Sequence, residues 1–416
     1  MRRIFTYFVL TIIASICTTI QVIANDYLRG DIMQPWEGGP AYFAKWKNGP
    51  STDATKFPIA VWYQQPRKAA AFKAIGINLF IYISKNEDIT PIAEQKMTVL
   101  PLAGQSSLSN ITGQNAASIT AWVLPKDEPD NSVEATGTSV PIAEVISSYN
   151  QQVKADPTRP VFLSLGSGVA SADWWGRGKR CGHSEDYYEY TKAGDWLSMD
   201  IYPMNLYRDS TLKEWKQPFL KAAAENIAII GTGIDNLRRY SGSKKPVLAW
   251  LECTNYERDA RCKLGPKHIK PEAWIAIIHG ARAIGYFCHI ISKPVVEAAV
   301  LKDSAMMSAI AVNNALIQSQ ACVLNTQTVK NAATVTSTNF AVPVSFMAKR
   351  YKRNTYIYAV AEQAGSTNAT FQLRAFKGNA TVEVVGENRS IKSKNGVFND
   401  SFRNFDVHIY KLKTSK

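Results

Sequence analysis

Short apolar runs alternate with longer segments of helical spacing along most of the chain. Residues 58–64 (PIAVWYQ) are rich in β-formers, and the Ala-rich stretch 67–75 after them ends at Gly76, a frequent helix C-terminal residue. This alternation continues to residue 319 and predicts an α/β protein with a parallel sheet. Further strands are expected at residues 77–83, 98–103, 120–124, 160–165, 196–202, 246–251 and 285–291, and further helices at 90–97, 140–155, 221–240, 271–284 and 295–319.

The number of units favours closure of that sheet into a barrel. Eight strands alternating with helices over this length match a (β/α)8 TIM barrel. The rival is an open doubly wound sheet, which usually carries a Gly-rich phosphate-binding turn after its first strand. Here that turn reads Gln64-Gln65-Pro66 and contains no glycine. The pattern therefore favours the barrel.

The pattern changes after about residue 325, where Thr, Val and Asn replace the Ala-rich segments. Apolar residues now alternate with polar ones, and Gly or Asn-Gly turns separate the runs. This predicts a small antiparallel all-β domain of sandwich type over residues 325–416, after a catalytic barrel over residues 25–324. Its strands are expected at residues 356–361, 370–375, 380–385 and 406–412.

Residues 1–24 are typical of a secretory signal peptide. Arg2 and Arg3 precede an apolar run over residues 4–16, and small residues around 22–24 offer a cleavage site. The alternative is an uncleaved membrane anchor, but the run is shorter than the ~20 residues that a span needs. No later stretch is apolar enough to cross a bilayer. The pattern predicts a protein without stable membrane insertion, secreted or periplasmic.

Composition adds little to this picture. A hydrophobic share of 46% is that of a globular protein, and the formal net charge of +14 suits either an acidic partner or plain solubility. Nothing resembles a nucleic-acid-binding module. Cleavage of the leader would leave five cysteines, Cys181, Cys253, Cys262, Cys288 and Cys322. Cys253 and Cys262 could close a short loop, and Cys181 could reach either. No C-x-x-C occurs and the five His are scattered, so neither a metal site nor a cofactor is expected.

Candidate chemistry follows from the barrel, because function sits at the C-terminal ends of its strands. Strands four and seven end near Glu128 and Glu252, which would face each other across the barrel mouth. Glycoside hydrolysis needs two carboxyl groups that flank one C–O bond, and sugar rings stack on flat aromatic faces. The other polar and aromatic residues expected at this rim are Trp62, Tyr63, Asp127, Asp200, Tyr202, Trp250, Asn255 and His289.

The connection from residue 167 to 195 is long for this fold, and long loops are often functional. We expect Trp174 and Trp175 within it to wall the cleft and bind substrate. The basic residues of this loop would favour an acidic or sulfated glycan; they are Arg177, Lys179, Arg180 and His183. The alternative is a surface loop tethered by a disulfide through Cys181.

Three short motifs resemble clan A glycoside hydrolases, which are retaining (β/α)8 barrels. TAWVLPKDEPDN (120–131) is similar to the fourth-strand segment that carries the acid/base Glu, and MDIYP (199–203) to the sixth-strand segment whose Tyr contacts the nucleophile. FNDSFRNFDVHIYKL (398–412) looks like the last strand of the appended β-sandwich. The resemblance implies Glu128 as acid/base, Glu252 as nucleophile and Tyr202 as its partner. Asp127 stands where that group has an Asn that binds the sugar 2-hydroxyl, which puts this contact in doubt.

The resulting hypothesis is a retaining β-glycosidase acting on a polysaccharide or oligosaccharide. Glu128 would be protonated near neutral pH and Glu252 ionised. A non-catalytic carbohydrate-binding protein on a barrel scaffold would keep the aromatic residues and lose one carboxylate. A surface-interaction protein, in which the β-domain and the positive charge do the binding, is the other alternative. The sugar, the linkage and the oligomeric state stay open.

Overall fold

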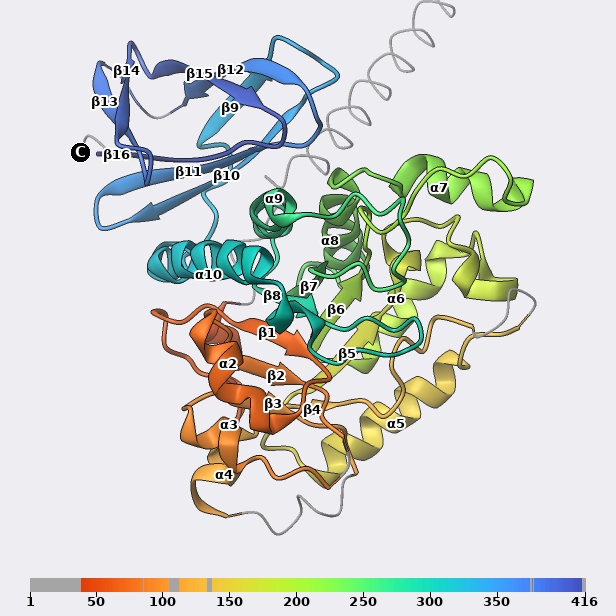
Figure 1. Cartoon of the computed structure of the whole chain (residues 1–416). Coiled ribbons are helices and arrows are strands. Elements are labelled where there is room, and N and C mark those ends of the chain that lie inside the picture. The colour runs from red at the N-terminus through yellow and green to blue at the C-terminus, as the bar shows by residue number, and fades with distance from the viewer. Residues whose placement is uncertain are drawn as a thin grey trace, which may run out of the picture.

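The computed structural model describes residues 39–413, apart from residues 85, 105–111, 133–136, 375 and 377. The leader-like segment 1–24 lies outside the described residues. Eight parallel strands form one sheet in the order β3-β2-β1-β8-β7-β6-β5-β4 (Figure 1). They are β1 (Ile59–Trp62), β2 (Leu79–Ile81), β3 (Thr98–Leu100), β4 (Trp122–Val123), β5 (Val161–Leu165), β6 (Trp196–Asp200), β7 (Val247–Glu252) and β8 (Ala283–Phe287).

The two ends of this strand order meet. Parallel bridges join Val99 to Ile119 and Leu102 to Val123, and the Val123 N–H donates to Pro101 O over 2.9 Å. β3 and β4 therefore touch through isolated bridges rather than a full ladder, and the sheet closes. The predicted fold class, a (β/α)8 barrel followed by an antiparallel β-domain, is confirmed.

Helices surround the barrel. They are α2 (Ala69–Ala74), α3 (Thr90–Glu94), α4 (Gly113–Ser118), α5 (Ile142–Ala155), α6 (Tyr187–Tyr190), α7 (Gln217–Ala223), α8 (Ala228–Tyr240), α9 (Pro266–Ile278), α10 (Ser304–Ser319) and α11 (Ala321–Leu324). Short 3-10 segments occupy several connections: η1 (Pro40–Lys45), η2 (Pro66–Lys68), η4 (Ser167–Val169), η5 (Trp175–Arg180), η6 (Ser184–Asp186), η7 (Thr191–Ala193), η8 (Glu214–Lys216) and η9 (Ala299–Lys302). Among the described residues, no helix combines the length and apolar character that a membrane span requires.

The two-residue period of the strands sorts side chains into two layers. In β7, Leu248 and Trp250 belong to the cluster inside the barrel, whereas Val247 and Ala249 pack outward under the helices. Gly285 of β8 makes room for the indole of Trp250, because a Cβ built there would lie 2.3 Å from the ring. The sequence thereby places a large aromatic ring near the barrel mouth.

The C-terminal part consists of two antiparallel sheets, in the orders β10-β11-β16-β13-β14 and β15-β12-β9. Their inner faces share a core in which Phe371 and Phe398 stack with ring centroids 4.8 Å apart. The stretch 398–412, expected to be one strand, contributes to two strands in different sheets, because the chain turns at Asn404 and Phe405. The strands are β9 (Ala333–Ser337), β10 (Val344–Tyr351), β11 (Asn354–Ala361), β12 (Ser366–Leu373), β13 (Ala380–Val384), β14 (Arg389–Ser393), β15 (Val397–Arg403) and β16 (Val407–Lys413).

This β-domain packs against the barrel helices, and the ring of Trp274 in α9 stacks on Tyr358 of β11 at 5.4 Å. His279, just after α9, lies 2.8 Å from Asp235 of α8 and 3.0 Å from Glu362 of the β-domain. Burial alone would lower the pKa of His279, but the two flanking carboxylates raise it to about 10. A charged imidazole thus joins the two parts.

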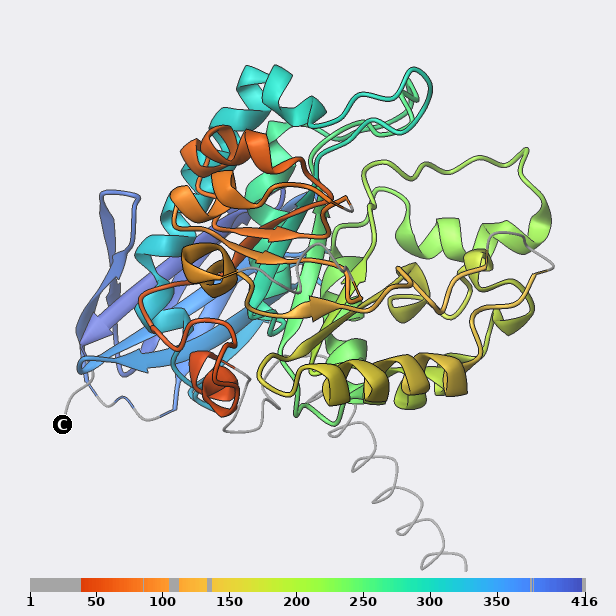
Figure 2. The same cartoon turned by 90° about the horizontal axis from the view of Figure 1, so that it is seen from below.

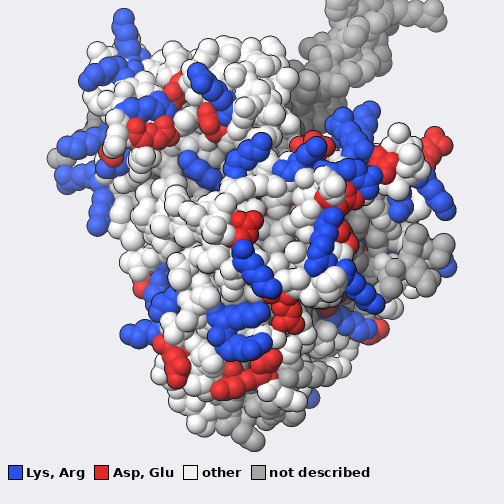
Figure 3. All heavy atoms as spheres, in the orientation of Figure 1, with Lys and Arg blue, Asp and Glu red and all other residues white. Residues whose placement is uncertain are grey.

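The long loops after β5 and β6 extend from the other side of the barrel, away from the β-domain (Figure 2). Lys and Arg are interspersed with Asp and Glu over the face shown in Figure 3. On that face the positive charge is spread out, as plain solubility requires.

Candidate active site

The segment after β4 is fixed by a buried carboxylate. Both oxygens of Asp130 are occupied, since Oδ1 accepts from the Gly166 N–H over 3.0 Å and Oδ2 from the Tyr187 hydroxyl over 2.8 Å. Burial raises the pKa of Asp130, and the guanidinium of Arg177 opposes that rise. These contacts tie the turn after β4 to the end of β5 and to α6. They set the position of the residues just before Asp130.

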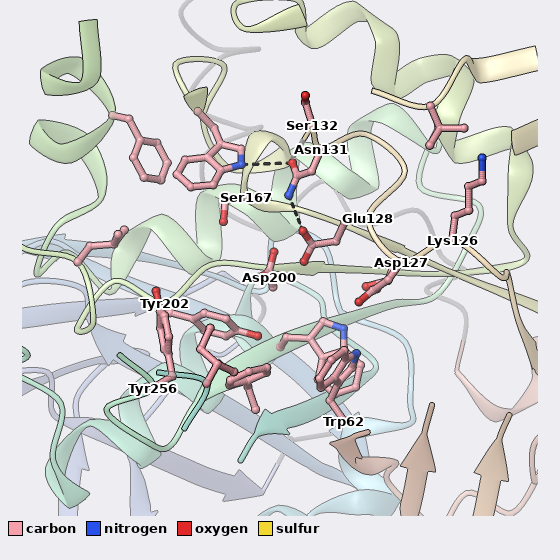
Figure 4. A pocket seen from close by; sticks show the side chains of 18 residues that line it. Trp62, Lys126, Asp127, Glu128, Asn131, Ser132, Ser167, Asp200, Tyr202 and Tyr256 are labelled. Carbon is pink, nitrogen blue, oxygen red and sulfur yellow. Dashed lines mark hydrogen bonds between the residues drawn. The ribbon is translucent and has the colours of Figure 1, made fainter. Parts of the chain in front are cut away.

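Glu128 occupies a strained position in this turn. Its φ is +43°, a left-handed conformation that non-glycine residues seldom adopt and that clusters at functional sites. The Asn131 side-chain amide donates to Glu128 Oε2 and accepts from the Trp174 indole N–H, over 3.2 Å in the second case. Figure 4 shows this chain of contacts as dashed lines. Asn131 thus positions both the carboxyl group of Glu128 and the indole ring of Trp174.

The carboxyl groups of Glu128 and Asp200, the last residue of β6, lie side by side in the cavity (Figure 4). Two ionised carboxylates this close repel each other, which favours a proton on one of them. Desolvation first, and the charges of Asp200 and Asp127 next, raise the pKa of Glu128 well above its usual range. Desolvation also raises the pKa of Asp200, to about 7, although its interaction with Glu128 works the other way. Glu128 is therefore the proton donor of the pair.

Asp127 lies beside this pair (Figure 4). Its Oδ1 accepts from the Tyr82 hydroxyl over 2.9 Å, and Ser164 also donates to the carboxylate. Although the residue is reached by solvent through the cavity, the surrounding protein desolvates its carboxylate and raises the pKa to about 6. Three carboxyl groups from β4 and β6 thus meet at one point.

These groups line a cavity of about 630 Å³ at the C-terminal ends of the barrel strands. Aromatic side chains from β1, β6, β7, β8 and the adjoining loops form most of its remaining wall. No group of three or more His, Cys, Asp or Glu in the described part of the chain has an arrangement suited to a metal ion. The lining residues are Trp62, Lys126, Asp127, Glu128, Asn131, Ser132, Val140, Ser164, Ser167, Trp174, Asp200, Tyr202, Leu206, Phe219, Trp250, Tyr256, Phe287 and Ile291.

Seven of the residues expected from sequence line this cavity: Trp62, Asp127, Glu128, Trp174, Asp200, Tyr202 and Trp250. Tyr63, Trp175, Asn255 and His289 lie near it or behind it. His289 contacts Gln64 and the Tyr63 carbonyl, 3.0 Å away, and its ring lies edge-on to Trp62. Asn255 binds the backbone of Asp259 in the loop after β7.

Glu252 ends β7, as expected, but it is not among the lining residues and is 1% exposed. Its carboxylate accepts from the Met204 N–H over 2.6 Å, from the Asn205 N–H over 2.9 Å and from the Asn205 side-chain amide over 2.6 Å. The buried carboxyl group of Glu272 in α9 interacts electrostatically with that of Glu252. The expectation that Glu128 and Glu252 both line one cleft is therefore not met, because donors from the loop after β6 enclose the carboxylate of Glu252.

Tyr202 also differs from its expected setting. Its ring packs against Tyr256 and Phe287, with centroids 5.8 and 5.5 Å away. Burial first and the charge of Asp200 second raise the pKa of its hydroxyl. The sequence predicts that Tyr202 contacts Glu252. In the structure, Glu252 accepts its hydrogen bonds from Met204 and Asn205 instead.

The basic residues of the loop 167–195 are mostly paired within the loop. Arg177 is 2% exposed and donates to Asp186 over 2.5 Å, and Arg180 binds the same carboxylate through two nitrogens. His183 lies 2.7 Å from Glu185. These pairs brace the loop, so Arg177 and Arg180 are not available to an acidic glycan.

No disulfide forms among the cysteines that the structure describes. Cys181 is an exposed thiol, so the loop is held by its ion pairs and not by a disulfide. Cys253 Sγ faces Cys288 Sγ at 3.5 Å, and Cys262 Sγ contacts Asn205. Cys253 and Cys262, which could have closed a short loop, are not joined, and β7 and β8 bring Cys288 opposite Cys253.

Asn131, Tyr82 and Ser164 belong to the site although the sequence did not single them out. Tyr82 comes directly after β2, just as Trp62 is the last residue of β1. Because functional residues of a barrel sit at the C-terminal ends of its strands, Tyr82 could have been predicted from the sequence. Asn131 belongs to the same motif as Glu128, three residues further on.

No known protein family profile matches the chain, and neither does any curated protein. Solved structures do match. A GH42 β-galactosidase from G. stearothermophilus, solved as a catalytic mutant, aligns at a TM-score of 0.52 and 9% identity over 86% of this chain and 98% of that one. A maltogenic α-amylase from Thermotoga neapolitana (0.49, 9% identity, 87% and 99% covered) and a GH30 endoxylanase from Clostridium papyrosolvens (0.46, 10%, 89% and 98%) follow.

These structural neighbours are glycoside hydrolases, and at such low identity the likeness to the β-galactosidase establishes the fold alone. Function has to be inferred from the site itself.

Proposed function

We propose that this protein is a glycoside hydrolase that cleaves O-glycosidic bonds of an oligosaccharide or polysaccharide by a retaining mechanism. Glu128 is the acid/base and Asp200 the nucleophile. The observation that carries the proposal is the pair of carboxyl groups, Glu128 after β4 and Asp200 at the end of β6, that lie side by side in an aromatic cavity. Two carboxyl groups and flat apolar walls are what glycoside hydrolysis requires.

In the first step the protonated Glu128 gives its proton to the leaving glycosidic oxygen while an Asp200 oxygen attacks the anomeric carbon. The C–O bond to the leaving group breaks as the glycosyl–Asp200 ester forms. In the second step the ionised Glu128 takes a proton from water, and that water displaces Asp200. The sugar leaves with its original configuration, and Glu128 is protonated again.

The retaining route is favoured by the closeness of the pair. An inverting enzyme keeps its two carboxyl groups roughly 6.5–9.5 Å apart to hold a water molecule between acid and base, and a retaining one roughly 5–5.5 Å apart. Glu128 and Asp200 lie side by side in the cavity, each shifting the pKa of the other. Asp127, oriented by Tyr82, adds negative charge beside the oxocarbenium-like transition state.

The sequence-based assignment of Glu252 as nucleophile stays a prediction, and the placement of its carboxylate speaks against it. A nucleophile must reach the anomeric carbon, whereas Glu252 is enclosed by donors from Met204 and Asn205.

The charge of the cavity also favours a neutral glycan. Lys126 is its one lining cation among the described residues, and it is paired with Glu144.

The leader-like composition of residues 1–24 supports the further proposal that the protein is exported. Expression of the full chain in a secreting host, with N-terminal sequencing of the product, tests this. Cleavage near residue 24 is the expected result.

A substrate panel tests the enzymatic proposal. Neutral polysaccharides and aryl glycosides of both anomers are incubated with the wild type, Asp200→Asn and Glu252→Gln. We expect hydrolysis by the wild type, loss by at least about 10³-fold in Asp200→Asn and substantial activity in Glu252→Gln. NMR of the first product shows the anomer. Loss in Glu252→Gln with activity kept in Asp200→Asn would restore the sequence-based assignment, and binding without hydrolysis by the wild type would support the carbohydrate-binding alternative.

A further inference from the structure

Trp215 is a large aromatic residue on the surface, 46% exposed, in the η8 segment between β6 and α7. It does not line the cavity. A contiguous exposed apolar patch marks a binding surface, whereas a single exposed aromatic residue does not. The question is whether this ring is connected to the catalytic floor.

A continuous series of aromatic contacts makes that connection. Trp174 and Phe219 form part of the cavity wall, with ring centroids 4.7 Å apart. Trp175 packs on Trp174 at 4.6 Å and on Phe219 at 5.1 Å, and Trp215 lies edge-on to Trp175 at 6.3 Å. The series therefore runs from the cavity wall outward to the solvent. We call Trp175 and Trp215 the outer platform.

A cation holds the outer platform together. The ammonium of Lys216 lies 4.9 Å from the ring centroid of Trp175 and 5.2 Å from that of Trp215. Cation–π contacts of this kind fix the relative orientation of two rings on neighbouring loops. The same ammonium group is a hydrogen-bond donor at the edge of the rings.

The loop that carries Trp215 is braced. The side-chain amide of Gln217 donates to the carbonyls of Asp209 and Leu212, over 2.8 and 2.9 Å. Phe219, two residues further on, is fully buried and anchors α7. The outer platform is thus held in place before any ligand arrives, which lowers the entropy cost of binding.

We propose that the outer platform binds a sugar unit of a neutral glycan chain whose scissile bond lies at Glu128 and Asp200. This inference rests on the proposed glycosidase function and specifies its substrate as a chain long enough to leave the cavity. Continuity with the cavity wall favours a glycan as the occupant. The apolar faces of sugar rings stack on indoles, and the Lys216 ammonium can donate to their hydroxyl groups.

The same contacts predict a dependence on chain length. A short substrate that fills only the cavity cannot reach Trp215, so the outer platform contributes nothing to its binding. A longer chain gains one stacking contact outside the cavity. Because that contact is remote from the reacting atoms, it lowers KM and leaves kcat nearly unchanged.

The kinetic test compares Trp215→Ala with the wild type on a chain-length series from whichever neutral polymer is hydrolysed and on a short aryl glycoside. We expect KM to rise roughly three- to tenfold for the longest chains, with no change for the aryl glycoside. Trp215→Phe should restore most of the loss. Phe340→Ala is the matched control, because Phe340 is an exposed aromatic of the β-domain. Equal effects on short and long substrates, or none on long ones, would overturn the proposal.

A binding test does not require turnover. Affinity electrophoresis in gels containing xylan, mannan, galactan, mixed-linkage glucan or amylose compares Asp200→Asn with Asp200→Asn/Trp215→Ala. Retardation of the first protein and its loss in the second are expected. Equal retardation of both, or of neither, rejects the outer platform. Failure of the wild type to hydrolyse any substrate, with the retardation difference still present, would reject the catalytic proposal and leave the glycan platform standing.

Discussion

Two pairs of carboxyl groups in this protein share the same electrostatics and differ in access. Glu128 and Asp200 interact at the ends of β4 and β6, and Glu252 and Glu272 interact between β7 and α9. In both pairs desolvation is the first cause of raised pKa values, and Asp200 and Glu252 are each raised to about 7. The first pair lines the cavity, whereas Glu252 is 1% and Glu272 0% exposed.

The comparison shows that a perturbed carboxyl pair is not sufficient evidence of an active site. Structural networks perturb pKa values as strongly as catalytic ones do. What distinguishes the cavity pair is a surface on which a sugar can lie and a strained backbone at Glu128. At the interior pair, the backbone N–H groups of Met204 and Asn205 contact Glu252 where a substrate would have to bind.

The largest expected difference between the two pairs is in how the hydrolysis rate depends on the leaving group. Glu128→Ala removes the proton donor, so hydrolysis of natural glycans should fall by about 10²–10⁴-fold. Aryl glycosides with activated leaving groups need little protonation, and their first step should continue. Steady-state and burst kinetics on both substrate types measure the difference.

Glu272→Gln is the matched control for this prediction, because it removes the protonated member of the interior pair. Its activity on both substrate types should stay within a few-fold of the wild type. A leaving-group dependence in Glu272→Gln would break the distinction between the two pairs.

The position of Glu252 could be predicted from the sequence, and its role could not. The run PVLAWL fixed the end of β7 to within one residue, and Glu252 stands there. The direction of its side chain depends on Met204 and Asn205, which precede it by 48 and 47 residues and donate to it after folding. Asp200 was expected at the rim as a binding residue, and its contact with Glu128 appears when β4 and β6 meet at the cavity.

The fold followed from hydrophobic periodicity because each strand is a compact apolar run. The predicted ends of helices were wrong where tertiary contacts divide or extend a helix. The helix expected at 221–240 is divided into α7 and α8, because Glu225 takes a φ of +57° and its N–H donates to Pro203 O. The helix expected from Pro271 begins at Pro266, after the N-cap Gly265. β9, β10 and β14 were not predicted, and β15 was predicted only as part of the stretch 398–412.

A smaller effect is expected from Asn131, whose amide joins Glu128 to Trp174. Its N–H favours the ionised form of Glu128, so Asn131→Ala should raise the pKa of that acid. The basic limb of the kcat/KM profile should therefore move to higher pH, with a fall of about tenfold at the optimum. A Cβ at position 166 would lie 2.4 Å from Asn131 Nδ2, so Gly166→Ala should reproduce the loss. An unmoved basic limb in Asn131→Ala would show that the amide is merely structural.

The next effect concerns the acid limb. Catalysis needs ionised Asp200, whose pKa is raised to about 7 by desolvation first and the charge of Asp127 second. The kcat/KM of the wild type should fall as the pH decreases below about 7. Asp127→Asn removes that charge, which lowers the pKa of Asp200, so the acid limb should move to lower pH. An acid limb that stays in place would mean that another group limits the rate.

The smallest effect concerns the stability of the interior pair. Burial raises the folded-state pKa of Glu252 to about 7 and that of Glu272 well above its usual range, whereas both are near 4.5 when unfolded. The folded state therefore holds more protons than the unfolded state above pH 4.5. Stability from this pair is complete below that pH and is lost as the pH rises through 7.

Glu272→Gln offers an amide donor to Glu252 at every pH, because a glutamine does not titrate. The loss of stability between pH 5 and 8 should thus be smaller in the variant than in the wild type, by a few degrees in Tm. The cavity pair contributes the same slope to both proteins, so the difference between their Tm curves isolates Glu252 and Glu272. Parallel Tm curves would show that Glu252 and Glu272 do not influence each other's protonation, and the likeness of this pair to the cavity pair would then end at burial.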